Sequence, residues 1–190
     1  MTEDVALAAE KALQRRAFRA KRTEAAAAHP DAALRLLEHF PMELARLSPV
    51  AGYWPVGAEI DPRVLMAALA RAGAIVALPR VTAKHGPTRF LLWQVGATLR
   101  PDAFGVPSPP ADAPEIRPQL ILVPLVGFDR TGRRLGQGGG HYDRILAAMR
   151  PGAMAVGLGF AEQEALCVPA GAHDQRLDWV VTQAEAVRCA

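Results

Sequence analysis

Residues 120–146 read LILVPLVGFDRTGRRLGQGGGHYDRIL, and this stretch carries the clearest structural signals in the chain. Its apolar start, Leu120–Leu125, predicts a buried core strand, and the amphipathic segment from His141 to Met149 predicts a helix. Between them stand a turn at Asp129–Gly132, two arginines and four glycines within five positions. The stretch therefore predicts a strand and a helix joined by a glycine-rich turn.

The glycine run is a candidate site for phosphate. Glycines lack a Cβ atom, so successive backbone N–H groups can converge on an anion, and a helix that begins behind them adds its positive end. The dinucleotide pattern G-x-G-x-x-G fails at His141, and no Gly-Lys-Ser/Thr follows for a Walker motif. Glycines alone also suit a plain strand-to-helix turn. Arg133, Arg134 and Asp143 favour phosphate, because nucleotide phosphates need cations and a carboxylate for a divalent ion.

Strands and helices alternate on both sides of this turn. We expect helices at residues 5–28, 31–40, 62–73 and 141–149, and strands at residues 50–54, 74–78, 90–93, 120–125, 153–158 and 178–182. A strand, a helix and a strand with short connections suggest a βαβ unit. The prediction is one α/β domain over residues 1–190, with three α/β/α layers, a mostly parallel central sheet and the N-terminal helix packed on this core. Six prolines between Pro101 and Pro118 indicate an ordered or extended loop.

Composition excludes several classes of protein. The net charge of +3 arises from 22 basic and 19 acidic residues, an excess too small to indicate nucleic acid or membrane binding. Two cysteines cannot build a disulfide framework and suit a reducing compartment. The N-terminus lacks the order of a secretory signal, and no apolar run approaches the roughly 18 residues that span a bilayer. A cytoplasmic protein is expected, and His29, His39, His85 and His173 show no zinc-binding pattern.

The segment from Gly127 to Asp143 resembles the signature of 5-formyltetrahydrofolate cyclo-ligases, also called methenyltetrahydrofolate synthetases. Agreement covers nearly the whole chain, since further matches fall in family order: Lys11 with Arg15, Glu59-Ile60-Asp61, Leu78-Pro79-Arg80, Phe104-Gly105-Val106-Pro107 and the stretch from Val168 to Thr182. The resemblance implies a three-layer α/β/α fold and the closure of 5-formyltetrahydrofolate to 5,10-methenyltetrahydrofolate with ATP and Mg²⁺. The implied route phosphorylates the formyl oxygen, after which folate N10 attacks and phosphate leaves, so no protein nucleophile is required.

By this resemblance, Arg134 and Asp143 are the catalytic residues, and Asp143 and Asp178 bind Mg²⁺. The implied ATP-binding residues are Lys11, Arg15, Arg134, Leu135, Gly136, Gln137, Gly138, Gly139, Gly140, His141 and Tyr142. The implied substrate-binding residues are Trp54, Glu59, Phe104, Gln137, Gly138, Gly139, Gly140 and His141. His173-Asp174 is interpreted as a turn that holds Asp178 in place.

Several of these residues have simpler interpretations. A Lys/Arg pair on a basic helix is usually a solvated face, although residues four apart can grip one triphosphate, and Arg16, Arg19, Lys21 and Arg22 are assigned to the solvated face. Glu59 suits a carboxylate near a helix N-terminus as well as a pterin contact. The aromatic residues Trp54, Tyr142 and Phe104 suit packing as well as ligand stacking. Gln137 and Gly139 stand where some members carry Arg and Lys, and His141 replaces a frequent aromatic residue.

Two other functions stay open at this point. A nucleotide-dependent transferase with another substrate could use the same fold, and folate-independent ATP hydrolysis would favour it. An RNA-binding protein could use the basic N-terminal helix, and salt-sensitive binding that ignores Mg²⁺-ATP would favour that class. The expected partner is a small-molecule folate rather than nucleic acid or a membrane. A monomer is expected, with a dimer left open.

Overall fold

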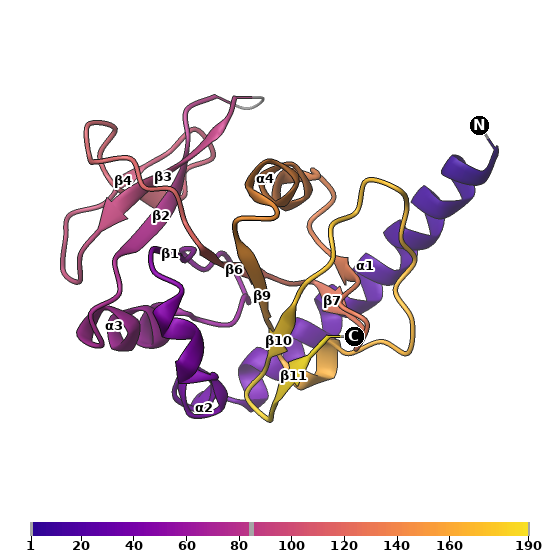
Figure 1. The fold of residues 1–190 in the computed structure, drawn as a ribbon. Coiled ribbons are helices and arrows are strands. Elements are labelled where there is room, and N and C mark those ends of the chain that lie inside the picture. Colours follow the sequence, from indigo (N-terminus) through magenta and orange to yellow (C-terminus); the bar gives the residue numbers. More distant parts are fainter. Residues whose placement is uncertain (1, 84–85, 190) are drawn as a thin grey trace.

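The structure, a computed structural model, describes residues 2–83 and 86–189 and shows helices on both sides of a central sheet (Figure 1). The helices are α1 (Thr2–Ala28), α2 (Ala32–His39), α3 (Arg63–Arg71) and α4 (His141–Met149), with 3₁₀ turns at Met42–Arg46 and Ala161–Gln163. The sheet contains β1 (Val50–Ala51), β2 (Val76–Val81), β3 (Thr88–Trp93), β6 (Leu120–Pro124), β9 (Met154–Leu158), β10 (Trp179–Val181) and β11 (Ala186–Arg188). Two small hairpins stand apart from it, formed by β4 (Arg100–Pro101) with β5 (Pro107–Ser108) and by β7 (Gly127–Phe128) with β8 (Arg134–Leu135).

The strand order of the sheet is β11-β10-β9-β6-β1-β2-β3. The five central strands are parallel, and only β3 and β11 at the two edges are antiparallel to their neighbours. The chain moves from β1 to β2 on one side and later places β6 on the other side of β1, so the order reverses between β1 and β6. Open α/β sheets bind ligands outside the carboxyl ends of strands at such a reversal.

Alternate residues of the central strands face two separate apolar cores. In β6, Leu120 and Leu122 pack in the core formed with α2 and α3, whereas Ile121 and Val123 pack in the core formed with α4. Because both faces of a parallel sheet are covered, its strands consist of continuous apolar runs instead of alternating patterns. The predicted α/β fold with a mostly parallel central sheet is confirmed.

The predicted helices and main strands are present, with differences at their ends. The strand expected at residues 50–54 stops at Ala51, because Tyr53 turns inward and its hydroxyl donates to the Ile60 carbonyl at 2.8 Å. The helix expected to begin at Pro62 begins one residue later, with Pro62 in the N-cap position predicted for Asp61. The Asp61 carboxylate still accepts the Arg63 N–H at 2.9 Å from the residue before the cap. Strand β11 and the two hairpins were not predicted, because strands of two or three residues carry no readable period. His85 lies outside the described residues.

The proline-rich segment is ordered and lies along the outer edge of β3. Its backbone pairs with that strand through an N–H of Leu92 to the Pro114 carbonyl at 2.8 Å and an N–H of Ile116 to the Phe90 carbonyl at 2.7 Å. The segment therefore covers an edge strand, as the prediction of an ordered loop allowed. Within the described part of the chain, no helix has both the length and the apolar character that crossing a membrane requires.

A buried carboxylate fixes the turn that leads into the glycine run. Asp129 is 2% exposed, and its Oδ1 accepts the N–H groups of Thr131 at 2.9 Å and Arg133 at 3.2 Å. Its Oδ2 accepts the N–H of Val168 at 2.9 Å, which ties the hairpin β7–β8 to a distant segment. One side chain thus satisfies backbone donors from two parts of the chain.

We expect Asp129→Ala to lower the free energy of unfolding by about 3 kcal/mol, because it leaves several buried donors without an acceptor. Urea denaturation measures this change. Asp112→Ala, which removes an exposed carboxylate, serves as the control and should leave the unfolding free energy within about 0.5 kcal/mol of the parent. Equal stabilities of the two variants would contradict the role given to Asp129.

Candidate functional site

The candidate site lies at the carboxyl ends of β1 and β6, where α1 packs against the hairpin β7–β8. Gly127 in β7 has no Cβ, and a Cβ built there would lie 3.1 Å from the ring of Phe18. Phe18 is buried in a small core with Val126, Leu135 and Val168. The missing side chain therefore lets α1 approach the strand that leads into the glycine run.

Four basic residues of α1 face this site. Their spacings of four, four and three residues place them on one side of the helix; they are Lys11, Arg15, Arg19 and Arg22. Arg15 Nε donates to the Gly136 carbonyl at 3.0 Å, and Arg19 Nη2 donates to the Gln137 carbonyl at 3.1 Å. Arg22 Nη1 donates to the Leu125 carbonyl at 3.2 Å. Assigning Arg22 to a solvated face was therefore wrong, because it is buried. Arg16, Arg19 and Lys21 are exposed as expected, although the Arg19 guanidinium also contacts Gln137.

The glycine run forms a turn that ends at the first residue of α4. Gly138 and Gly140 have φ of 109° and 62°, a backbone region that favours glycine, and Gly140 is the N-cap of the helix. The carbonyls of Gly136 and Gln137 accept hydrogen bonds from α1, and the Gly139 carbonyl accepts one from Arg144 at 2.9 Å. With these oxygens engaged, an anion at the turn meets guanidinium groups and the positive end of α4.

Arg134, Asp143 and Asp174 form a charged cluster beside the run. Arg134 has a side chain only 4% exposed, and it donates to Asp143 Oδ1 at 2.8 Å and to the Gln175 carbonyl. Burial lowers the pKa of Arg134, and the charge of Asp143 opposes that shift. The N–H of Gln175 donates to the same Asp143 oxygen at 3.0 Å. A small hollow of about 160 Å³ opens here, lined partly by Arg133, Arg134 and Asp174.

Lys11 reaches this cluster from α1. Its ammonium group contacts Asp174, which also accepts the N–H of Gly171. Burial favours the neutral form of Asp174, but the hydrogen bonds from Lys11 and Gly171 outweigh it and hold its pKa below the usual range. Asp174 is therefore ionised at neutral pH. The structure brings together Lys11, Arg15, Arg134, Asp143 and the glycine run, as the sequence predicted.

Asp178 lies elsewhere. Its Oδ2 accepts the N–H of Ala155 at 2.7 Å and pairs with Arg150 Nη2 at 2.9 Å. Asp143 lies in the first turn of α4, whereas Arg150, the partner of Asp178, directly follows the last turn. The backbones of Asp143 and Arg150 are therefore about 10 Å apart along the helix axis. Within the described residues, Asp178 therefore contacts Arg150 and β9 and shares no hydrogen bond with Asp143, and the metal pairing of these two aspartates stays a prediction. Asp174, interpreted from the sequence as a turn residue, directly precedes Gln175, whose N–H contacts Asp143, and its charge acts on Arg134.

No sequence pattern distinguishes Asp174 from Asp178, because they lie only four residues apart in the same segment. Only the tertiary fold separates their side chains. Within the described ranges, no group of three His, Cys, Asp or Glu side chains is arranged to hold a metal ion. A divalent ion here would need ligand oxygens from a bound phosphate in addition to protein carboxylates, which is how Mg²⁺ usually binds.

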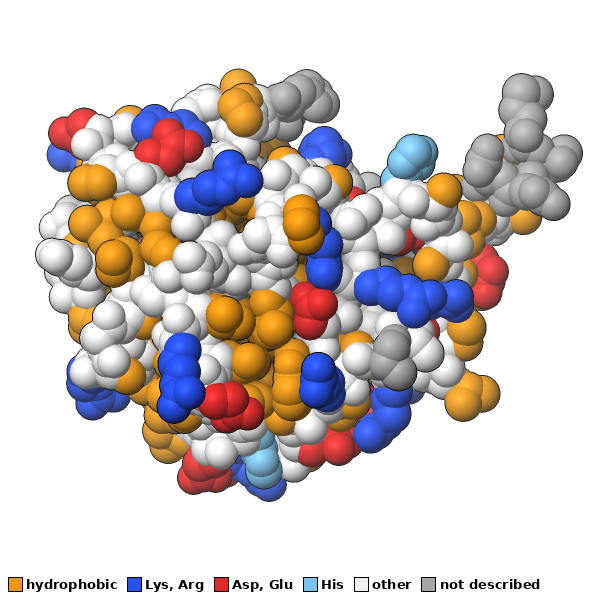
Figure 2. All heavy atoms as spheres, in the orientation of Figure 1, with side chains coloured by type: hydrophobic (Ala, Val, Ile, Leu, Met, Phe, Trp, Pro, Cys, Tyr) orange, Lys and Arg blue, Asp and Glu red, His pale blue; other side chains and the backbone are white. Residues whose placement is uncertain are grey.

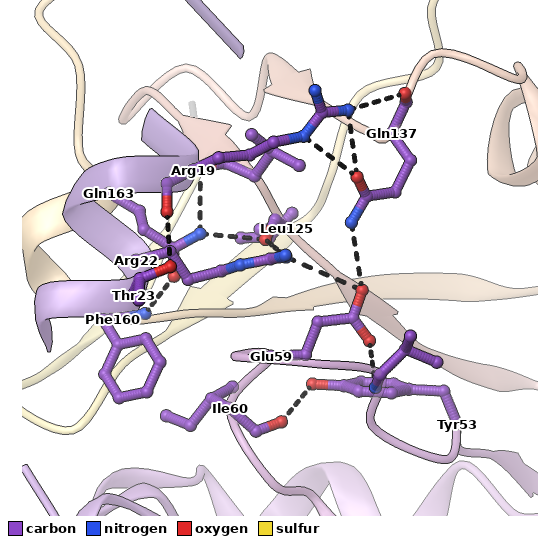
Figure 3. A network of polar contacts seen from close by, with 12 residues as sticks. Arg19, Arg22, Thr23, Tyr53, Glu59, Ile60, Leu125, Gln137, Phe160 and Gln163 are labelled. Atoms are coloured by element: carbon purple, nitrogen blue, oxygen red, sulfur yellow. Dashed lines mark hydrogen bonds and ion pairs between the residues drawn. The ribbon is translucent and has the colours of Figure 1, made fainter. Parts of the chain in front are cut away.

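Glu59 lies beside the glycine run on its other side. Its Oε1 is 3.4 Å from Gln137 Nε2 and 3.6 Å from Arg22 Nη1, and its side chain is 8% exposed (Figure 3). Burial, followed by the charge of Glu59, raises the pKa of the half-buried Tyr142, so this phenol stays protonated at neutral pH. Trp54, half-buried, carries the Arg63 guanidinium 5.0 Å above its ring. The Gln137 side chain therefore connects the glycine run to Glu59, the carboxylate predicted to bind the substrate.

The remaining predicted residues lie at the rim. His141 Nε2 is 2.9 Å from the Thr88 hydroxyl, and burial together with the charge of Arg144 lowers its pKa, so the imidazole is neutral at pH 7. Phe104 is 53% exposed on the proline-rich loop, where the Asp102 carboxylate accepts its N–H at 2.8 Å. A stacking role for Phe104 stays a prediction.

These features define the class of binding site. A glycine-rich turn, a helix N-terminus, cations from a second helix and a carboxylate in the first turn are gathered at the strand reversal of an open α/β sheet. Such a site suits a small molecule that bears phosphate groups. The chain belongs to the 5-formyltetrahydrofolate cyclo-ligase family, whose sequence model matches residues 3–183. The family resemblance seen in the sequence is thereby confirmed.

Known proteins agree with this assignment. The chain is 33% identical over 141 residues to a 5-formyltetrahydrofolate cyclo-ligase of Mycolicibacterium smegmatis, covering 70% of this chain and 72% of that one. The Escherichia coli enzyme of that name is 33% identical over 121 residues, or 61% of this chain, and the chain spans 65% of its length. The NMR structure of Aquifex aeolicus 5,10-methenyltetrahydrofolate synthetase superposes with a TM-score of 0.77 at 26% identity, covering 94% of this chain and 92% of that one.

The structural roles of the two aspartates are testable through stability. Asp178→Ala should lower the unfolding free energy by about 2 kcal/mol, because it leaves the fully buried Ala155 N–H without an acceptor and removes the carboxylate partner of Arg150. Asp174→Ala should cost less, about 1 kcal/mol, because the Gly171 N–H that loses its acceptor is partly exposed. Thermal and urea unfolding measure both variants. A larger loss of stability for Asp174→Ala than for Asp178→Ala would contradict these roles.

Proposed function

We propose that the protein catalyses the ATP-dependent cyclisation of 5-formyltetrahydrofolate to 5,10-methenyltetrahydrofolate, with release of ADP and phosphate. The observation that carries the proposal is that two groups of charged residues meet at the glycine run. Cations of α1 and the Arg134 cluster lie on one side, and Glu59 lies on the other, joined through Gln137. Family membership supports the reaction, and the contacts on the two sides of the glycine run support a site for both substrates.

On the phosphate side, Lys11, Arg15 and Arg134 provide positive charge, and the N-terminus of α4 provides backbone donors. Arg134 is preorganised, since Asp143 and the Gln175 carbonyl hold its guanidinium in one orientation. Such fixed charges stabilise a transferring phosphoryl group without reorganisation during the reaction. The family residues proposed from the sequence, from Leu135 to Tyr142, line this same turn.

Mg²⁺ fits the carboxylates on this side. The described hydrogen bonds of Asp143 all fall on Oδ1, which leaves Oδ2 for a ligand, and Asp174 precedes Gln175, whose N–H contacts the same carboxylate. When bound, the ion would neutralise phosphate charge and orient the triphosphate. We propose Asp143 as a protein ligand, with Asp174 as a second candidate in addition to the Asp178 that the sequence predicted.

On the folate side, Glu59 would accept hydrogen bonds from the N–H groups of the pterin ring, with Trp54 and the glycine run beside it. The formyl oxygen then forms a bond to the γ-phosphorus as the bond to ADP breaks. Folate N10 attacks the activated formyl carbon and loses its proton, and the C–O bond breaks to release phosphate. The protein contributes position and charge, consistent with the lack of a nucleophile in the sequence.

We also place the protein in the cytoplasm. Cys167 and Cys189 are free thiols, and Cys167 is exposed, which suits a reducing compartment. On the face drawn in Figure 2, Lys and Arg side chains are spread among acidic and apolar ones, so this face gives the RNA-binding alternative no support. Folate dependence of ATP turnover separates the proposal from a general nucleotide-dependent transferase.

Arg134→Ala and Asp143→Ala should each reduce kcat/KM by about 100-fold or more, because each removes preorganised charge at the phosphoryl group. The rate is followed by the ultraviolet absorbance of the methenyl product from 5-formyltetrahydrofolate and Mg²⁺-ATP. Arg117→Ala, which alters an exposed arginine, should retain parental activity. Full activity in both site variants would place the chemistry elsewhere.

Gly138→Ala should weaken ATP binding about tenfold or more, because its φ of 109° suits glycine and the new methyl would lie near the Arg15 guanidinium. Gly96→Ala is the matched control, since Gly96 also has a positive φ, 82°, but stands in open space away from the site. Both changes strain the backbone similarly, so stability should fall alike. Isothermal titration with ATP separates them, and equal affinities would argue against the turn as the phosphate site.

A further inference from the structure

Arg22 is buried although it lies on a strongly basic helix. Its side chain is 9% exposed, with Nη1 bonded to the Leu125 carbonyl and 3.6 Å from Glu59 Oε1. Burial lowers the pKa of Arg22, and the charge of Glu59 opposes that shift. Among the described residues, its Nε finds no hydrogen-bond partner. Desolvating a guanidinium this way costs free energy that Leu or Met at the same place would not.

The loop that carries Glu59 is held from several sides. The buried Tyr53 hydroxyl donates to the Ile60 carbonyl, and the N–H of Val56 donates to Glu59 Oε2 at 3.0 Å. The other oxygen, Oε1, faces Arg22 and Gln137 (Figure 3). Arg22 is thus the cation that compensates a carboxylate almost withdrawn from water.

Arg19, one turn earlier on α1, controls the orientation of Gln137. Its guanidinium donates to Gln137 Oε1 at 3.1 Å and to the Gln137 carbonyl at 3.1 Å. With its oxygen engaged there, the Gln137 amide presents its N–H₂ group to Glu59. One helix therefore fixes both neighbours of Glu59 Oε1, and the same helix carries Lys11 and Arg15.

We infer that Arg22 is a positioning residue for the folate side of the reaction. It holds the Glu59 carboxylate in its orientation, so that Glu59 accepts hydrogen bonds from the pterin N–H groups. Arg22 acts through Glu59 and does not touch the transferring phosphoryl group. This inference rests on the proposed function, and it adds a residue that the helix pattern alone assigned to solvent.

A double-mutant cycle tests the inference with Arg22→Met, Glu59→Gln and the combined variant. Arg22→Met should raise KM for 5-formyltetrahydrofolate about tenfold or more and change KM for ATP by less than about threefold. In the Glu59→Gln background the same change should alter the folate KM by less than about twofold, because its target is gone. Arg22→Lys should recover part of the folate affinity, since it restores the charge.

The controls separate this role from a structural one. Arg16→Met changes an exposed arginine of the same helix and should leave both KM values within about twofold of the parent. Circular dichroism checks that each variant folds, and if Arg22→Met does not, the cycle is run with Arg22→Lys and Arg22→Gln. Additive effects of the Arg22 and Glu59 changes, or equal losses for both substrates, would overturn the inference. A parent protein without cyclisation activity would instead overturn the proposed function.

Discussion

The site depends on how closely α1 lies against the carboxyl edge of the sheet. Phe18 packs over a glycine in β7, and this contact places one face of the helix along the loops that leave β1 and β6. Cations at intervals of three and four residues then contact Asp174, the glycine run and the loop that carries Glu59. A helix held farther away would leave the same charges in water, where each is worth little.

That arrangement preorganises the charges of the site. Arginines and carboxylates of the site are held by mutual hydrogen bonds before any ligand arrives, as in the contact of Arg134 with Asp143. Desolvation makes each charge expensive, and the partner on the opposite element compensates for it. The binding geometry is therefore built from ion pairs between elements that are distant in the sequence.

Sequence patterns predicted the layers of this fold well, because buried parallel strands such as residues 120–124 are continuous apolar runs and α4 begins directly after the glycines. They failed where only tertiary packing decides. Asp174 and Asp178 are four residues apart and chemically identical, yet they lie near opposite ends of α4. Arg22 was predicted to be a solvated charge, because a helical pattern does not reveal that the Glu59 carboxylate, from another loop, packs against the same face of α1.

The proline-rich segment also determines where the sheet ends. It runs along the outside of β3, and through the N–H groups of Leu92 and Ile116 it occupies hydrogen-bonding positions that an edge strand leaves open. Proline has no N–H to offer on its own outer side, so the segment is a poor template for a further strand. A stretch that reads as loop thus protects the protein against edge-to-edge aggregation.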